Sequence, residues 1–248
     1  MISSRTRLDR FLSQALQIKR RDVRLLLAQS RVEVDGLKAT AIHQVVDRFS
    51  RVSVDGRALN DLGARYVMLN KPKGVVSATK DERHTTVIDL LPEEQQAGLH
   101  IVGRLDFNST GLVLLTNDGR WSRALTQPET KVPKTYRVEV AEAITDECIQ
   151  GFCDGMYFPF EDVVTRPAIL NRLAPKLAEV ILEEGRYHQI KRMFGRYDNK
   201  VVELHRESIG SLTLDASLAP GECRALLSDE VGALNQLSWQ GAGASKLD

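Results

Sequence analysis

The sequence predicts an α+β (mixed α/β) protein with a small basic N-terminal domain over residues 1–60 and a larger domain over residues 61–240. Helical and strand periodicities are interleaved along the chain, which favours a mixed fold class. A length of 248 residues allows two domains. Charge also divides the chain, because residues 1–60 hold 12 Lys and Arg against 6 Asp and Glu, whereas the remainder holds 22 against 27.

The composition is that of a globular protein, with 42% hydrophobic and 27% charged residues. No apolar run approaches the roughly 18 residues that a membrane span needs, and the N-terminus lacks the apolar core of a secretory signal. We therefore expect a cytoplasmic protein that does not associate with membranes. The three cysteines have no paired spacing, so we expect neither a metal site nor a catalytic thiol.

The N-terminal domain is predicted to begin with two helices. Apolar residues at i, i+3, i+4, i+7 and i+8 give residues 8–16 one apolar face. A second helix fits residues 21–29 and begins at a basic run. Such a charge asymmetry suggests binding of a polyanion, although a solvated basic face without a partner explains the charge equally well.

Two alternating strands follow, at residues 31–36 and 51–56, and each ends in an Asp-Gly turn. Residues 57–64 are polar and weakly periodic, which indicates a linker. Two helices and small β-ribbons make a module of about 60 residues, a size that can fold alone.

The larger domain is predicted to contain a mixed, mainly antiparallel sheet flanked by helices. Residues 80–98 are expected to form a loop with a short helix, and the preceding segment 71–74, KPKG, a charged turn. The predicted strands are residues 66–70, 99–102, 111–116, 134–140, 177–183 and 201–205. The predicted helices are residues 119–127, 145–153, 187–197 and 228–236.

The most informative stretch is residues 103–119, GRLDFNSTGLVLLTNDG, which places Asp106 in a polar loop between two apolar strands. Catalytic groups often occupy loops held by rigid strands, but a lone Asp in such a loop is more often a turn or cap residue. The chain has neither a GxxxxGK[ST] nor a GxGxxG pattern, which argues against nucleotide cofactors.

This whole string resembles the signature GRLDxxTxGLLLLTNDG of the RsuA-type pseudouridine synthases, with Phe107 and Asn108 at its variable positions. Residues 134–136, KTY, and 184–194, EGRYHQIKRMF, are similar to the family motifs KTY and EGRxxQ[IV][RK]RMF. The resemblance implies three catalytic residues: the essential carboxylate, a Tyr that stacks on the target base and a cation that pairs with the carboxylate. These are Asp106, Tyr136 and Lys191.

Two details of that resemblance bear on the site. Many members have Arg where this chain has Lys191, and Lys keeps the charge but loses the planar fork. The position of His188 is variable in the family, so we interpret His188 as structural or RNA-facing.

Residues 5–58 resemble the S4 RNA-binding domain through RLDRFL, the basic second helix, RVEVDG and RVSVDG. Ser30 departs from the pattern, since the family often has Gly there. The resemblance implies phosphate contacts, which give affinity but little sequence discrimination, from Arg20, Arg21 and Arg24. In the larger domain the basic residues expected to line the RNA path are Lys71, Arg104, Arg186 and Arg192.

The resemblance implies isomerisation of uridine to pseudouridine. The strings HQIKRMF and VELHRESIG resemble those of the small-subunit members of the family. That resemblance implies 16S ribosomal RNA, at a uridine of the position-516 type, or a small-subunit assembly intermediate as the substrate. The reaction is redox-neutral and adds no atoms, so we expect no small-molecule cofactor. The carboxylate could attack C1′, attack C6 or remove a C2′ proton, and the sequence leaves these roles open. We expect a monomer.

Two alternatives remain at this point. A large-subunit (23S) rRNA pseudouridine synthase would use the same chemistry on another RNA. A non-catalytic RNA-binding ribosome-assembly factor would keep the fold, but it has no chemical reason to retain Asp106, Tyr136 and Lys191 together. A methyltransferase tethered to an S4 domain would need a Gly-rich cofactor loop, and the sequence contains none.

Overall fold

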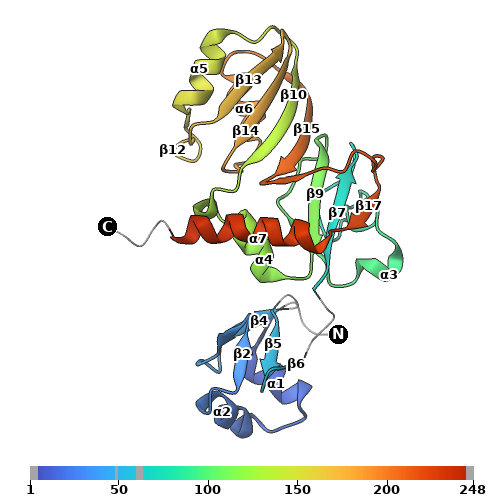
Figure 1. Cartoon of the computed structure of the whole chain (residues 1–248), viewed down its shortest axis with the longest axis vertical. Helices are drawn as coiled ribbons and strands as arrows, with labels where there is room; N and C mark the ends of the chain where they lie inside the picture. Colours follow the sequence, from blue (N-terminus) through green and yellow to red (C-terminus); the bar gives the residue numbers. More distant parts are fainter. Residues whose placement is uncertain (1–4, 48–49, 60–63, 244–248) are drawn as a thin grey trace.

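The computed structural model describes residues 5–47, 50–59 and 64–243, which form a small N-terminal unit (residues 5–59) and a larger unit (residues 64–243) (Figure 1). The N-terminal unit has a hydrophobic core of its own, which includes Leu8, Leu12 and Val32. The two units meet where Arg123 of the larger unit donates to Asp35 at 3.0 Å. Within the described residues, no helix is both long and apolar enough to cross a membrane.

Two helices and two sheets make up the N-terminal unit. Helices α1 (Leu8–Ala15) and α2 (Arg20–Ala28) bury one apolar face each, as the periodicity predicts. Strand β1 (Arg5–Arg7) pairs with β4 (Val45–Asp47). The second sheet has the order β3-β2-β5-β6. Its strands are β2 (Val32–Val34), β3 (Leu37–Lys38), β5 (Val52–Val54) and β6 (Arg57–Ala58).

Both predicted Asp-Gly turns are present. Asp35 and Gly36 have φ values of 54° and 79°, and Asp55 and Gly56 have 52° and 76°, which is the two-residue hairpin turn that this dipeptide favours. The prediction of a linker at residues 57–64 is wrong at its start, because β6 pairs with β5 there. Residues 60–63 of that segment lie outside the described residues.

Helix α2 ends in a Schellman motif whose left-handed position is occupied by Ser30, with φ 54°. The Ser30 amide donates to Leu27 O at 2.9 Å and the Arg31 amide to Leu26 O at 3.1 Å. Glycine is the usual residue at this position because it has no Cβ to clash.

We expect Ser30→Gly to stabilise the N-terminal unit by about 0.5–1 kcal/mol, since relief of left-handed strain exceeds the added entropy of the unfolded chain. Native-state hydrogen exchange of the α2 amides measures this change. Ser30→Ala, which keeps the strain, should give no gain. Faster exchange in Ser30→Gly than in the wild type would contradict the expectation.

The larger unit is built on a nine-stranded sheet of order β13-β14-β10-β15-β9-β7-β17, with β16 on β15 and β8 on β9. Only β9 and β15 run parallel among its described strand pairs, so the predicted mixed, mainly antiparallel sheet is confirmed. Its strands are β7 (Tyr66–Lys71), β8 (His100–Val102), β9 (Thr110–Thr116), β10 (Lys134–Val140), β13 (Ile169–Ala174), β14 (Leu177–Leu182), β15 (Val201–Ile209), β16 (Leu212–Thr213) and β17 (Cys223–Ala225). A separate hairpin joins β11 (Tyr157–Phe158) to β12 (Val163–Val164).

Helices cover both faces of this sheet. Because successive strand residues point to opposite faces, Leu69 and Val113 pack in the cluster with the helices α5 and α6, whereas Met68 and Leu114 pack with α4 and α7. Figure 1 shows α4 and α7 side by side. The helices are α3 (Glu93–Gln96), α4 (Gly119–Thr126), η1 (Pro128–Thr130), α5 (Asp146–Asp154), α6 (Gln189–Gly195) and α7 (Ser228–Gly243).

The parallel pair β9–β15 joins two halves of the sheet. Its register pairs Thr110 with His205 and Gly111 with Arg206. A Cβ on Gly111, which has φ 102°, would lie 2.3 Å from the Arg206 carbonyl oxygen, so the close approach of the strands requires glycine there. On one side lie β7, β8 and β17, and on the other β10, β13, β14 and β16.

Candidate active site

Asp106 lies in the loop 103–109 that connects β8 to β9, beside the junction of the two half-sheets. We call residues 103–109 the site loop. Lys71, at the end of β7, is fully buried beneath it. Its Nζ donates to the carbonyls of Ser109 at 2.8 Å, Asp106 at 3.1 Å and Phe107 at 3.3 Å. The Lys71 side chain therefore fixes the backbone at Asp106 and in the residues that follow it.

The burial of Lys71 corrects the prediction that this side chain lines the RNA path. Its ammonium is enclosed by carbonyl oxygens, including that of Pro72 at 3.1 Å, and cannot reach a phosphate. Burial lowers the pKa of Lys71 to about 8, a shift that the charge of Asp106 partly opposes. In a charged turn such as KPKG, sequence alone did not distinguish a buried Lys from an exposed one.

Two more side chains hold the site loop. Arg206, which is only 2% exposed, donates through Nε to Leu112 O at 2.7 Å and through Nη2 to Gly103 O at 2.8 Å. The Ser77 hydroxyl donates to Leu105 O at 2.7 Å and accepts from the Leu105 amide at 3.1 Å. Arg206 thus ties the start of the site loop, and β9 just beyond its end, to β15 across the junction.

The predicted ion pair is formed: Lys191 Nζ lies 2.7 Å from Asp106 Oδ2. The two side chains are 31% and 29% exposed, so the carboxylate remains accessible to a substrate. His188 Nε2 lies 3.3 Å from the same oxygen. The interpretation of His188 as merely structural or RNA-facing is therefore incomplete, because the ring contacts the candidate catalytic carboxylate.

Residues 184–194 place Lys191 through hydrogen bonds of their own. Gln189 Nε2 donates to Glu184 Oε1 at 2.7 Å, and the Arg186 amide donates to Gln189 Oε1 at 3.0 Å. His188 takes a left-handed conformation, with φ 49°, so α6 begins at Gln189 and not at 187 as predicted. This turn directs both His188 and Lys191 at Asp106, which helical periodicity alone could not indicate.

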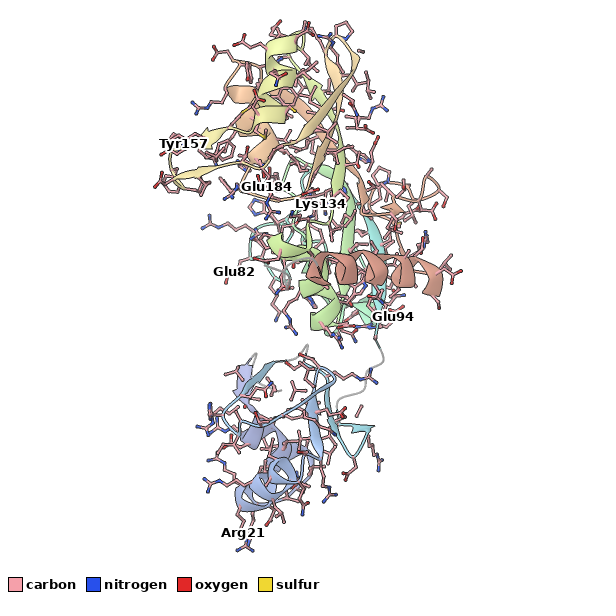
Figure 2. The ribbon with its side chains drawn as sticks, turned by 60° about the vertical axis from the view of Figure 1, so that its left-hand side comes forward. Arg21, Glu82, Glu94, Lys134, Tyr157 and Glu184 are labelled. Carbon is pink, nitrogen blue, oxygen red and sulfur yellow. The ribbon has the colours of Figure 1, made fainter. Side chains whose placement is uncertain are left out.

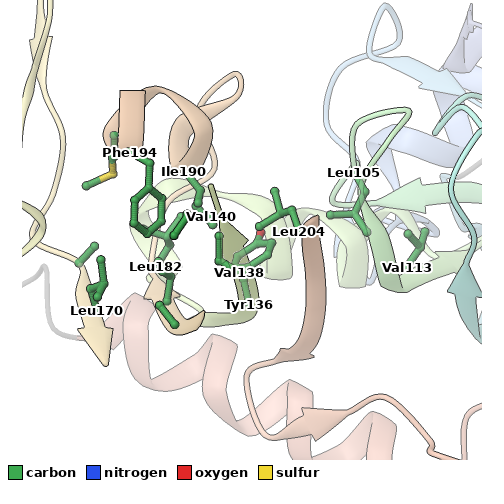
Figure 3. Close-up of a cluster of buried hydrophobic side chains, with 14 of the residues drawn as sticks. Leu105, Val113, Tyr136, Val138, Val140, Leu170, Leu182, Ile190, Phe194 and Leu204 are labelled. Atoms are coloured by element: carbon green, nitrogen blue, oxygen red, sulfur yellow. The ribbon is translucent and has the colours of Figure 1, made fainter. Parts of the chain in front are cut away.

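Tyr136 lies on β10, in the half-sheet that also carries α6. Its side chain is 8% exposed and lies between Val138 and Leu204 in Figure 3, with Leu105 of the site loop on the side of β9. The ring therefore belongs to the core that supports the site loop.

The predicted RNA-contacting arginines fall into three groups. Those of α2 are exposed, and Figure 2 shows Arg21 at the end of the N-terminal unit farthest from Glu184. Arg104 is exposed on the site loop. Arg186 is 33% exposed and lies 3.1 Å from Glu184.

Arg192 forms the third group: its side chain is 28% exposed, and its guanidinium also makes contacts within the protein. Its guanidinium donates to both carboxylate oxygens of Glu161, at 2.6 and 2.7 Å, and lies 3.7 Å from the centre of the Phe158 ring. The hydrogen bonds raise the pKa of Arg192 and lower that of Glu161. Arg192 therefore ties α6 to the β11–β12 hairpin.

Lys134, at the start of β10, is a second partly buried cation near the junction. Its Nζ donates to Val132 O at 2.8 Å. Burial, followed by the charge of Arg206, lowers the pKa of Lys134 to about 8 from its ordinary 10.5.

This shift predicts a pH-dependent stability. Between pH 8 and 10.5 the unfolded chain holds the Lys134 proton that the folded chain has lost, so the free energy of unfolding rises with pH there, by at most about 1.4 kcal/mol per unit. In urea unfolding at pH 7.5, 8.5 and 9.5, the free energy of unfolding of the wild type should increase with pH relative to that of Lys134→Met. A constant difference between the two proteins would contradict the expectation.

Comparisons with known proteins agree with this geometry. Residues 65–195 match the family model described as RNA pseudouridylate synthase. The chain is 50% identical over 226 residues to "Ribosomal small subunit pseudouridine synthase A" of Pseudomonas aeruginosa, covering 91% of this chain and 98% of the relative. It is 42% identical over 230 residues to the protein of the same name in Escherichia coli, covering 92% and 99%.

A solved structure described as a pseudouridylate synthase superposes with a TM-score of 0.70 at 34% identity, covering 92% of this chain and 99% of that one. The family model covers more than half of the chain and includes Asp106, Tyr136 and Lys191. The chain therefore belongs to the RsuA-type branch of the RNA pseudouridylate synthase family, whose members are RNA isomerases.

Proposed function

We propose that this protein isomerises a uridine of 16S ribosomal RNA to pseudouridine, with Asp106 as the essential carboxylate. The observation that carries the proposal is the contact of 2.7 Å between Lys191 and Asp106 on a loop held from three sides. The substrate is inferred from the relatives named ribosomal small subunit pseudouridine synthase A. Within 16S ribosomal RNA, the site is a uridine of the position-516 type, either in free RNA or in an assembly intermediate.

The reaction breaks the N1–C1′ bond, turns the uracil and joins C5 to C1′, while the C5 proton is lost and N1 gains one. Lys191 donates to Oδ2 of Asp106 and fixes the direction of the carboxylate. Oδ1 accepts no hydrogen bond from the described residues and so remains for the substrate. Attack at C1′, attack at C6 and removal of a C2′ proton all begin from a carboxylate oxygen.

Tyr136 is proposed to stack on the uracil once it has left the RNA stack. Unstacking costs a few kcal/mol, and aromatic stacking recovers part of that energy. Tyr136 already packs in the cluster that contains Leu105 of the site loop. A base that meets Asp106 would therefore come close to this ring.

Residues 1–60 are proposed to act as an S4-type RNA-binding domain and residues 61–240 as the catalytic domain. The exposed arginines of α2 would contact phosphates, and so binding should weaken steeply with salt. These arginines are Arg20, Arg21 and Arg24. Arg104, Arg186 and the exposed part of Arg192 would contact the RNA nearer to Asp106. Because one chain carries all these residues, we propose that the protein acts as a monomer. We propose that it does so in the cytoplasm.

The test incubates the purified protein with three substrates: protein-free 16S rRNA, 16S rRNA carrying assembly proteins, and 23S rRNA. Carbodiimide labelling and primer extension map pseudouridine in each product. One new stop in 16S rRNA supports the proposal. A stop only in 23S rRNA would keep the chemistry and overturn the substrate. No stop in any RNA, with binding intact, would favour a non-catalytic assembly factor.

A further inference from the structure

Two pairs of aromatic rings lie exposed beside Asp106. Tyr187 is 73% exposed, and its ring stacks on that of His188, with centroids 3.9 Å apart and planes 20° from parallel. Phe107 is 41% exposed and meets the edge of the His84 ring at 5.2 Å. Each pair leaves a large part of an aromatic side chain in contact with solvent.

Both pairs are tied to the candidate catalytic carboxylate. Phe107 follows Asp106 in the site loop, whose backbone Lys71 fixes through the carbonyls of both residues. His188 reaches Asp106 Oδ2 at 3.3 Å. One pair therefore comes from the half-sheet that carries the site loop, and the other from the segment that begins α6.

The surroundings of these rings favour a preformed binding surface. His84 is held by Asp81, whose carboxylate accepts from the His84 amide at 2.9 Å and approaches His84 Nδ1 at 3.2 Å. His188 is held on the other side by its left-handed backbone and by Asp106. An exposed ring already supported by a second ring loses little freedom when a flat ligand stacks on it.

An unpaired nucleotide base is such a ligand, since every base offers a flat π-face to an aromatic side chain. Phe107 follows Asp106 in the chain, and His188 lies 3.3 Å from its carboxylate. A base beside a uridine that reaches Asp106 would therefore come close to these rings.

We propose that Tyr187–His188 and Phe107–His84 are two stacking platforms that bind the nucleotides flanking the target uridine, one on each side. The inference rests on the proposed function and extends it: the substrate segment is single-stranded, and both neighbours of the target are unstacked from the RNA. The platforms act on substrate binding and position, whereas the bond changes occur at Asp106.

The test measures kcat and KM on a short unpaired RNA that contains the target uridine. Tyr187→Ala and Phe107→Ala should each raise KM roughly 5- to 100-fold with little change in kcat. Tyr187→Phe, which keeps the ring, should restore the wild-type KM. Tyr157→Ala is the matched control, because Tyr157 is also exposed, at 46%, but lies on β11 and bonds to Asp162.

Abasic substitutions assign each platform to a side. An abasic nucleotide on one side of the target should remove the effect of one alanine variant and leave that of the other. Unchanged KM values in both variants, or effects that persist with abasic nucleotides on both sides, would overturn the proposal.

The failure of the proposed function would be seen separately. If the wild type forms no pseudouridine, binding still tests the platforms. The same RNA, with the fluorescent base 2-aminopurine beside the target uridine, is bound to the Asp106→Asn variant, and stacking on a platform should quench its fluorescence. If Tyr187→Ala or Phe107→Ala abolishes this quenching, the platforms bind bases without turnover, whereas quenching that neither substitution changes would overturn the platforms as well.

Discussion

The Asp106→Asn variant is expected to lose more than roughly a thousandfold in turnover while it keeps its affinity for RNA. The amide cannot act as a nucleophile or base, and it leaves Lys191 without a counter-charge at 2.7 Å. Asn has the shape of Asp, and the site loop is held through backbone carbonyls and not through the carboxylate. The fold should therefore persist. Single-turnover pseudouridine formation and RNA binding by filter retention measure the two quantities.

The matched control is Asp198→Asn, which makes the same change at an exposed residue just after α6. Asp198 has φ 50°, a conformation that Asn tolerates, so turnover should stay at the wild-type level. Turnover of Asp106→Asn within tenfold of the wild type would exclude Asp106 as the essential carboxylate. Loss of RNA affinity in this variant would indicate that the carboxylate orders the site.

The second large effect is expected for Lys71→Met. The thioether fills the space but offers no donor, so Ser109 O loses its buried hydrogen bond from Lys71, while Asp106 O and Phe107 O keep those from the amides of Ser109 and Gly74. Because an unsatisfied buried acceptor costs about 1–3 kcal/mol, we expect a loss of that size in the free energy of unfolding. Turnover should fall as well, since Asp106 is no longer positioned. Urea denaturation and single-turnover kinetics test both expectations.

Lys73→Met is the matched control, two residues away in the same turn but exposed, and it should alter neither stability nor turnover. A Lys71→Met protein as stable and as active as the wild type would show that the hydrogen bonds of Lys71 do not hold the site loop. Lost stability with full turnover would separate its structural contribution from the position of Asp106.

The sequence predicted those parts of the fold whose signals are local. The apolar face of α1, the helix α2 and the two Asp-Gly turns depend on residues close together in the chain, and periodicity and turn chemistry report such features. The sequence did not predict β13, because only Leu170 of its six residues is buried and its apolar and polar residues do not alternate as in a half-buried strand. β17 has three residues and exists through its pairing with β7.

The candidate site shows the same division. Resemblance to a family located Asp106 and Lys191, and the structure places them in contact. The position of His188 against Asp106 depends on a left-handed turn before α6, for which a His carries little sequence signal. The burial of Lys71 depends on carbonyls more than 30 residues away in the chain. The charge of Lys71 therefore predicted an exposed side chain, whereas the fold buries it.

The pairing of β7 with β17 has a consequence for the nascent chain. β7 ends at Lys71, and its partner strand begins 152 residues later at Cys223. At a synthesis rate of about 5–20 residues per second, roughly 8–30 s pass between the synthesis of β7 and that of its partner. Arg206, which holds Gly103 at the start of the site loop and Leu112 in β9, is also synthesised late. The hydrophobic core and the strand pairs of the N-terminal unit lie within residues 5–59, so this unit can fold during that interval, whereas the site around Asp106 is assembled only near the end of synthesis.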